Sequence, residues 1–273
     1  MAAGMINLQK ASGGITKISS ADGTGVTELV VPESGELTTS KSISGFKKPA
    51  GYKNRVIFTK TAPASFTIPS GLVLVVNNKV IETSSQITLS LNSNLDTGTK
   101  VAGTDYYVYA KEDGTFYISA SKTKTDKLFG GFHYGLTPEN EVRPAAALKT
   151  EADMVMSRGI KGYSFWDLSW LPKSGIPEGK VLVDNKFWRD IYPADADYGI
   201  RGYSSCFAIG GGVAKIAGGA ATNGRLFPKI PLAYGGNGTL NYGSLTWYEA
   251  SELAGSVGNR HIATSLTGMF YRY

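Results

Sequence analysis

The sequence predicts a mainly β protein, and its glycine content, its low charge and two hairpin patterns indicate this. Glycine accounts for 34 of the 273 residues, and charged residues make up only 18%. An average soluble domain has about 7% glycine and about 25% charged residues. This balance favours short strands joined by many turns. Hydrophobic residues at 42% are enough to bury a core, which excludes wholesale disorder.

The chain is expected to fall into three parts. Residues 1–46 alternate short apolar triplets with Gly, Ser and Thr, and read as an N-terminal β segment with strands near 15–18 and 26–31. That segment has too little apolar surface to fold alone, so we expect it to pair with copies of itself or with a neighbouring protein. Residues 47–125 are expected to form a small antiparallel β domain, and residues 126–273 an α+β domain.

Two hairpins are predicted in the antiparallel domain. The run Leu72–Val76 meets Lys79–Ile81 across two asparagines, which tolerate the positive φ of a tight turn. The tyrosine-rich run Tyr106–Ala110 meets Thr115–Ser119 across a turn that contains glycine. Alternating tyrosines can form a sugar-stacking face, but in antiparallel strands they more commonly pack against each other across the strands.

Glycines and aromatic residues dominate the beginning of the third part. The run Phe129–Gly135 reads as a strand whose glycines mark the close approach of another backbone. A helix is predicted from Thr246, because Thr246 and Glu249 have the spacing of a capping box, and Gly258 ends it. Three tryptophans are expected to anchor the core: Trp166, Trp188 and Trp247.

Residues 199–243 contain 12 glycines in 45 positions, so we expect long loops that can display a binding surface. Tyrosine and arginine dominate binding hot spots, and this late part of the chain is rich in both. The last three residues can alternatively form a final strand in the core or continue into a longer chain. The candidate receptor-binding residues are Tyr234, Tyr242, Arg260, Tyr271, Arg272 and Tyr273.

Charge and hydropathy limit the kinds of partner that the chain is expected to bind. The net charge is +6 with no basic block, which suits an anionic cell surface better than a nucleic acid. The longest apolar runs, such as Leu72–Val76, fall far short of the ~18 residues of a membrane span. The first residues lack the pattern of a secretory signal. We therefore expect synthesis in a cytoplasm and no membrane insertion.

The sequence offers little support for a catalytic site or a metal site. Cys206 is the single cysteine, and His133 and His261 are the only histidines, so neither an internal disulfide nor a histidine-rich metal cage is expected. Cys206 and His261 are interpreted as structural residues. The glycines that follow Ile209 lack the lysine and Ser/Thr of a phosphate-binding loop. No metal and no cofactor are predicted.

Two carboxylate groupings remain open. Asp167 with Glu178 or Asp184 can supply the acid pair of a glycosidase, since a sequence does not reveal their separation. Three aspartates can surround a calcium ion, although the glycine and the closing glutamate of an EF-hand loop are missing. We interpret those three as solvated loop carboxylates: Asp190, Asp195 and Asp197.

Two stretches carry a family resemblance. Residues 92–135, with Leu95-Asp96-Thr97-Gly98, Asp113-Gly114 and Gly130-Gly131-Phe132-His133, resemble the β module that precedes the lectin-like domain of phage tail-fibre and receptor-binding proteins. The motifs Phe165-Trp166-Asp167-Leu168, Phe187-Trp188-Arg189-Asp190 and Thr246-Trp247-Tyr248-Glu249 resemble the opening of a C-type-lectin fold. This variety of the fold is shared by phage tropism determinants and formylglycine-generating-enzyme-like proteins.

The resemblance implies a non-enzymatic phage virion protein, a tail fibre or receptor-binding subunit made in the host cytoplasm. Its implied partners are a host cell-surface receptor, either polysaccharide or protein, and other virion tail proteins, with a homotrimer by analogy with fibres. The alternatives are a structural adaptor or capsid-decorating protein and, with less support, a polysaccharide depolymerase. The family's lectin domain has a long second half, so this one is either abbreviated or part of a longer fibre. The oxidase activity of the formylglycine-generating enzymes is not implied, because Cys206 has no partner cysteine.

Overall fold

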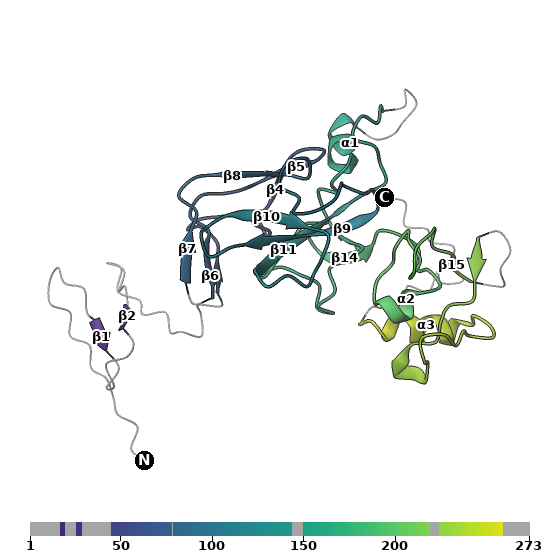
Figure 1. Ribbon diagram of the computed structural model, residues 1–273. Helices are drawn as coiled ribbons and strands as arrows, with labels where there is room; N and C mark the ends of the chain where they lie inside the picture. Colours follow the sequence, from purple (N-terminus) through teal and green to yellow (C-terminus); the bar gives the residue numbers. More distant parts are fainter. Residues whose placement is uncertain are drawn as a thin grey trace, which may run out of the picture. The chain divides into compact units, whose positions relative to one another are not determined.

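The N-terminal segment forms a separate compact unit. The computed structural model describes residues 17–19, 26–28, 45–77, 79–143, 150–218 and 224–258. Its two compact units are residues 1–44 and residues 45–273. In the first unit, β1 (Lys17–Ser19) pairs antiparallel with β2 (Val26–Glu28) (Figure 1). The rest of the strands predicted near 15–18 and 26–31 lies outside the described residues.

Two three-stranded antiparallel sheets open the second unit. The first has the order β3 (Phe46–Lys47), β6 (Val73–Val76), β7 (Lys79–Glu82). The second has the order β4 (Thr59–Ala62), β5 (Ser65–Ile68), β8 (Ile87–Ser90). The predicted hairpin between β6 and β7 is confirmed, and Asn77 in its turn has a φ of +46°. Asparagine tolerates that left-handed conformation better than most residues.

The boundary between the two units lies at residue 44 and not at 46. Phe46 pairs with Leu74 across β3 and β6 and is only 7% exposed within the main core. Lys48 forms an ion pair with the fully buried Asp167. Both residues therefore belong to the second unit, because removing either would expose or unpair buried groups.

A four-stranded antiparallel sheet forms the centre of the second unit. Its order is β10 (Phe116–Ser119), β9 (Thr104–Ala110), β11 (Lys127–Tyr134), β12 (Trp166–Asp167). The predicted tyrosine-rich hairpin is confirmed as β9 and β10. The expected boundary between residues 125 and 126 is corrected, because β11 pairs with β9 over almost its whole length. Strands from both sides of that boundary thus share one sheet.

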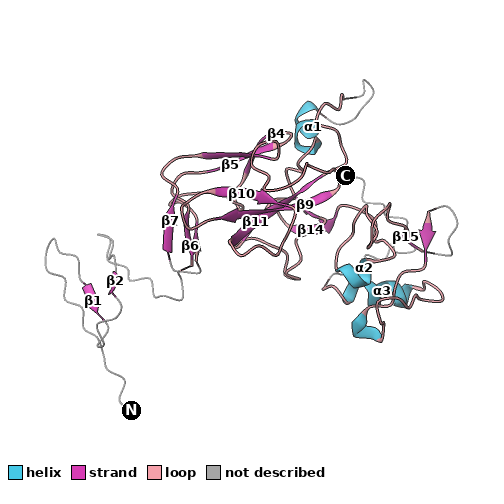
Figure 2. Cartoon of the chain, in the orientation of Figure 1, coloured by secondary structure: helices cyan, strands magenta, loops and turns pink. Residues whose placement is uncertain are grey.

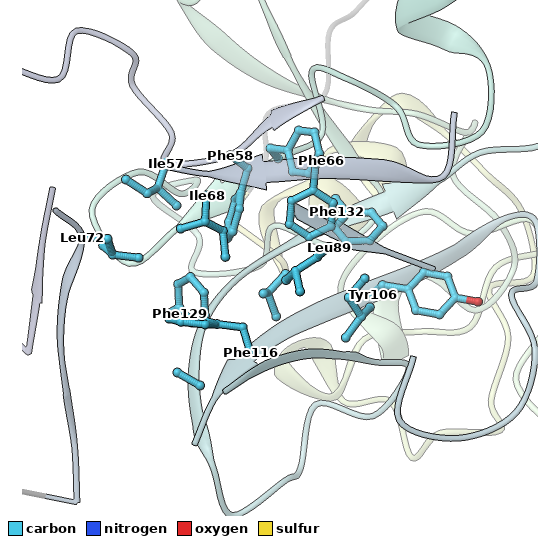
Figure 3. Close-up of a cluster of buried hydrophobic side chains, with 14 of the residues drawn as sticks. Ile57, Phe58, Phe66, Ile68, Leu72, Leu89, Tyr106, Phe116, Phe129 and Phe132 are labelled. Carbon is cyan, nitrogen blue, oxygen red and sulfur yellow. The ribbon is translucent and has the colours of Figure 1, made fainter. Parts of the chain in front are cut away.

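Phenylalanine rings fill the core between these sheets (Figure 3). Phe66 on β5 is fully buried, and its ring centroid lies 5.3 Å from Phe58, 5.1 Å from Phe132 and 5.3 Å from Phe165. Edge-to-face and tilted ring pairs at this spacing add attraction to the burial of apolar area. Residues from β5, β11 and the loops beside them therefore form one continuous core.

Gly130 and Gly131 on β11 allow close packing against β12, as predicted for this run. A Cβ atom on Gly130 would lie 2.6 Å from the carbonyl oxygen of Trp166. One on Gly131 would lie 2.6 Å from the carbonyl oxygen of Tyr106 and 2.7 Å from the Trp166 ring. Any larger residue here would force the sheet apart, since neighbouring backbones have no room to move.

The remaining elements are short and lie mostly in the last third of the chain (Figure 2). A β13–β14 hairpin is followed by small helices and one two-residue parallel strand pair. The mainly β fold class is confirmed. None of the described helices is long and apolar enough to cross a membrane. These elements are α1 (Glu151–Ser157), β13 (Lys180–Val183), β14 (Phe187–Asp190), α2 (Tyr198–Arg201), β15 (Ile216–Ala217), β16 (Arg225–Leu226), the 3-10 turn η1 (Leu232–Tyr234) and α3 (Trp247–Gly255).

Both longer helices begin with a capping box. The predicted one is confirmed at α3, where Thr246 accepts from the Glu249 backbone and the Glu249 side chain accepts from the Thr246 backbone. Helix α1 was not predicted from the sequence; its capping box consists of Thr150 and Asp153. With an aspartate at the third position and only seven residues, this helix lacks the usual Ser/Thr-x-x-Glu signature.

Glu139 provides a pH-dependent contribution to stability at the end of β11. Its Oε1 accepts from Tyr134 Oη at 2.6 Å and pairs with Lys100 Nζ at 2.5 Å. Burial acts to raise the pKa of Glu139, but the hydrogen bonds from Lys100 and Tyr134 outweigh it and hold the pKa below its ordinary value. A carboxyl with a lowered folded-state pKa stabilises above its unfolded pKa and loses that stabilisation as the pH falls.

Replacing Glu139 with glutamine is therefore expected to lower the free energy of unfolding at pH 7 by up to about 1 kcal/mol. The difference from the unmodified chain should shrink as the pH falls below about 4.5. Urea unfolding at pH 7 and pH 3 measures both values. An equal difference at the two pH values would contradict the ionic role of Glu139.

Candidate functional site

The described residues of the glycine-rich segment 199–243 (199–218 and 224–243) form loops, as predicted, with only short pieces of regular structure. Gly210, Gly211 and Gly212 all have φ between +80° and +102°. A Cβ atom on any of them would meet nothing within 4 Å. These glycines therefore serve a turn conformation at the surface and not a close packing contact.

A buried network of charges anchors these loops to the rest of the unit. Asp195 pairs with Arg201 at 2.7 Å, and Asp197 pairs with Lys229 at 2.8 Å. Burial raises the pKa of Asp195 despite the nearby Arg201 guanidinium. Burial also acts to raise the pKa of Asp197, but the hydrogen bond from Lys229 outweighs it and the pKa lies below its usual range.

The expectation of solvated loop carboxylates is corrected at Asp195 and Asp197, since both are buried and face protein cations. The third aspartate, Asp190, pairs instead with Lys180 at 2.7 Å. No group of three or more potential metal ligands occurs among the described residues. Side-chain ammonium and guanidinium groups thus neutralise these carboxylates.

Backbone amides bind the same carboxylates and set the shape of a hairpin at residues 206–214. Ser205 N donates to Asp195 at 3.0 Å, and Ile209 N donates to Asp197 at 2.8 Å. Ala214 N donates to Cys206 O at 2.9 Å, which closes the hairpin. Its apolar side chains remain outside: Val213 is 80% exposed.

A second loop, residues 229–241, approaches α3 at Gly255, where an added Cβ atom would lie 3.7 Å from the Tyr234 hydroxyl. Ile230 N donates to Leu240 O, and Tyr242 N donates to Pro228 O. Leu253 of α3 packs with Tyr198 of α2 and with Val257. Large apolar side chains of this loop and of the first turn of α3 are exposed to solvent. Trp247 and Tyr248 are in ring contact, with centroids 5.4 Å apart. We refer to these five individually exposed side chains together as the aromatic surface: Leu232, Tyr234, Leu240, Trp247 and Tyr248.

The predicted receptor-binding residues divide into three groups. Tyr234 is 48% exposed and belongs to the aromatic surface. Tyr242 is buried, and its hydroxyl donates to Glu252 at 3.2 Å. Burial and the Glu252 carboxylate raise the pKa of Tyr242 to about 12. Its expected role as a displayed residue is therefore corrected. The others lie outside the described residues: Arg260, Tyr271, Arg272 and Tyr273.

The three tryptophans assigned to the core also differ. Trp166 on β12 is buried, with its ring 6.4 Å from Tyr107 in an edge-to-face arrangement. Trp188 on β14 is half-buried against the same cluster. Trp247 is 56% exposed, which corrects its assignment to the core. Only the second half of α3 is buried against α2, so its first turn reaches the surface.

Two of the three carboxylates considered for glycosidase chemistry pair with different lysines. Asp167 accepts from Ile57 N at 2.7 Å and pairs with Lys48 at 3.0 Å. Glu178 accepts from Tyr107 at 3.1 Å and pairs with Lys122 at 2.5 Å. Asp184 occupies a turn with a φ of +49°. Each of the first two carboxylates thus stabilises a buried junction of its own.

A buried series of hydrogen bonds between the central sheet and the following loops was not predicted from the sequence. His133 Nδ1 lies 3.0 Å from Asp105 Oδ1, and His133 Nε2 lies 2.9 Å from the Tyr192 hydroxyl. Burial raises the pKa of the neighbouring Cys206 thiol, which keeps it protonated. His133 and Asp105 are direct cross-strand partners on β11 and β9. Knowledge of that register would have identified the pair.

The chain is similar to known phage receptor-binding proteins. The family described as "Mtd second domain" matches residues 56–167, which run from the loop before β4 to the end of β12. The tail fiber receptor-binding protein of Bordetella phage BPP-1 is 29% identical over 215 residues, covering 76% of this chain and 50% of the relative. The chain therefore spans about half the length of that curated relative.

Solved structures of the Major Tropism Determinant show the same similarity. The P3c variant has a TM-score of 0.67 and 25% identity, covering 92% of this chain and 62% of that one. The M1 variant has a TM-score of 0.61 and 28% identity, covering 78% and 52% respectively. The resemblance to phage receptor-binding proteins predicted from sequence is confirmed. The aromatic surface lies outside the stretch that the family matches.

Proposed function

We propose that this chain is the receptor-binding part of a phage virion protein that attaches the particle to the host cell surface. The observation that carries the proposal is the aromatic surface, where Tyr234 at the end of η1 and Tyr248 in the first turn of α3 are 48% and 75% exposed. Tyrosine offers a large contact area at a small entropic cost. The similarity to a tail fiber receptor-binding protein supports the same role.

The proposal also covers how the protein is organised within the virion. The part of the chain that follows residue 167 corresponds to a C-type-lectin-like region, and residues 1–44 dock to other tail proteins of the virion. Three chains associate into a homotrimer, which brings three aromatic surfaces to one fibre. The protein is made in the host cytoplasm, acts without catalysis, and needs neither a nucleic acid nor insertion into a membrane. The net charge of +6 favours approach to an anionic bacterial surface.

Binding of the fluorescently labelled chain to bacteria tests the proposal. The cells are those that a phage carrying this chain infects, with a resistant strain that has lost adsorption as the control. Saturable binding to the first strain and its absence on the second are expected. Equal binding to both strains, or none to either, would favour the structural adaptor and refute attachment.

Deleting residues 1–44 separates the docking role from folding. The deletion removes a unit that is compact by itself, so residues 45–273 are expected to keep the melting temperature of the full chain. The shortened protein should fail to enter virions. Deleting residues 1–48 is the matched comparison, since it also removes Phe46 from the core and Lys48 from Asp167.

Thermal unfolding and quantification of the chain in purified particles provide the two measurements. Residues 45–273 should unfold like the full chain, whereas the longer deletion should unfold at a lower temperature. Incorporation of residues 45–273 at normal copy number would contradict the docking role of the N-terminal segment.

A further inference from the structure

A groove lies along β10, the edge strand of the central sheet, far in sequence from the aromatic surface. Its volume is about 510 Å³, within the roughly 300–1,000 Å³ that small-ligand sites occupy. The segment 94–96 forms one wall, because Asp96 N donates to Ile118 O and Ile118 N donates to Asn94 O. The polar residues of the lining that carry the argument are Asn94, Asp96, Lys111, Tyr117, Lys124 and Asp126.

The charges of the groove are balanced. Lys124 Nζ pairs with Asp96 at 2.7 Å. Burial acts to raise the pKa of Asp96, but the hydrogen bonds from Lys124 and Ser119 lower it below its usual range. Asp126 accepts from the Tyr117 hydroxyl at 2.8 Å, and Lys111 is the second cation of the lining. Two cations and two carboxylates leave no net charge to select an ionic ligand.

Tyr117 supplies an aromatic face beside these polar groups. Its ring is stacked on Tyr109 at a centroid distance of 5.3 Å, so one face is used within the sheet. The ammonium of Lys111 lies over the ring at 5.4 Å from the centroid. Lys111 is exposed, and its flexible side chain can move aside at little cost, which opens the ring to a flat apolar surface of a ligand.

The polar groups match hydroxylated ligands. Carboxylates accept hydrogen bonds, ammonium groups donate them, and a saccharide hydroxyl can do both at once. The Ser93 hydroxyl donates to Asn94 Oδ1 at 3.1 Å, so the Ser93 oxygen as an acceptor and the Asn94 amide nitrogen as a donor add polar groups of the same kind. The partly buried ring of Tyr117 would contact the carbon-bound hydrogens of a sugar ring.

We propose that this groove binds one hexose unit of a neutral glycan. The site would give the protein a second contact with a glycan-covered cell surface, separate from the aromatic surface. It stands on the groove's own geometry, and it holds whether or not the aromatic surface binds a receptor. A failure of either proposal therefore leaves the other intact.

Titration of the full chain with maltotriose and with chitotriose, observed by saturation-transfer NMR, tests the proposal. At least one trisaccharide is expected to bind with a millimolar or lower Kd, because shallow polar grooves contact only part of a ligand. Tyr117→Ala should weaken binding at least about 10-fold, and Asp96→Asn at least about 5-fold. Tyr117→Phe keeps the ring and should retain most of the affinity. Lys79→Gln on the exposed β7 is the control and should change nothing.

The test of the saccharide site does not depend on any single variant. Melting temperatures identify any variant that is not folded, and Asp96→Asn preserves the side-chain shape if Tyr117→Ala fails to fold. Absence of binding by both trisaccharides at concentrations up to about 20 mM would overturn the proposal. So would undiminished binding by Asp96→Asn and Tyr117→Ala. Binding of inorganic phosphate in place of the trisaccharides would identify an anion site and refute a neutral ligand.

Discussion

Replacing Phe66 with alanine is expected to lower the free energy of unfolding by about 3–5 kcal/mol, the usual cost of truncating a buried phenylalanine. The Phe66 side chain is fully buried, and three phenylalanine rings surround it within 5.1–5.3 Å. These neighbours come from β11 and from two loops, so none can collapse into the cavity without moving its own backbone. A loss of this size is a large fraction of the stability of a typical domain.

Equilibrium urea unfolding of the two chains measures this difference. Phe66→Leu fills most of the same volume and should cost less than about 1.5 kcal/mol. Tyr163→Ala, at an exposed position, should change the stability by no more than about 0.5 kcal/mol. Equal costs for Phe66→Ala and Phe66→Leu would show that Phe66 does not hold the core together.

Removing two tyrosines of the aromatic surface is expected to abolish most attachment to host cells. Tyr234→Ala combined with Tyr248→Ala should weaken binding at least about 30-fold, since a single hot-spot residue contributes about 2 kcal/mol or more. Both side chains are exposed, at 48% and 75%, so the melting temperature should stay nearly unchanged. The affinity for cells is measured with the labelled chain over a range of concentrations.

The matched control is Tyr163→Ala, which removes an exposed tyrosine outside the glycine-rich loops. Its backbone carbonyl, which accepts from Leu182 N, is preserved in the variant. This control should bind cells like the unmodified chain. If the double variant binds normally, or if both proteins weaken together, the aromatic surface is not the contact with the receptor.

Local patterns in the sequence predicted two hairpins, one strand of the central sheet and one helix. The β6–β7 and β9–β10 hairpins follow from strand-forming runs on either side of turn residues, and α3 follows from its capping box. The glycines of β11 were correctly associated with close backbone approach. Each of these features depends on residues that are near one another in the chain, which is why their spacing alone identifies them.

Contacts between distant residues could not be predicted in the same way. Asp167 meets Lys48, and Glu178 meets Lys122, across sequence separations that no local pattern reveals. The pairing of β11 with β9 removed the expected boundary at residue 125, because strand order is a property of the assembled sheet. A single sequence carries no register information for such pairs.

The candidate site was predicted as a region more successfully than as a set of residues. The glycine count identified residues 199–243 as loops, and Tyr234 is displayed there. Tyr242 is buried and Trp247 is exposed, contrary to expectation. Composition indicates which residue types favour a surface, whereas the burial of each depends on how the loop 229–241 approaches α3.

Competition between the purified chain and intact phage for host cells tests the central proposal most directly. The unmodified chain, at concentrations that saturate cell binding, is predicted to slow phage adsorption at least about 10-fold. The Tyr234→Ala, Tyr248→Ala double variant at the same concentration should leave adsorption unchanged. If the unmodified chain occupies the cells and phage adsorb at their normal rate, its binding is not the attachment step, and the proposed receptor-binding function is contradicted.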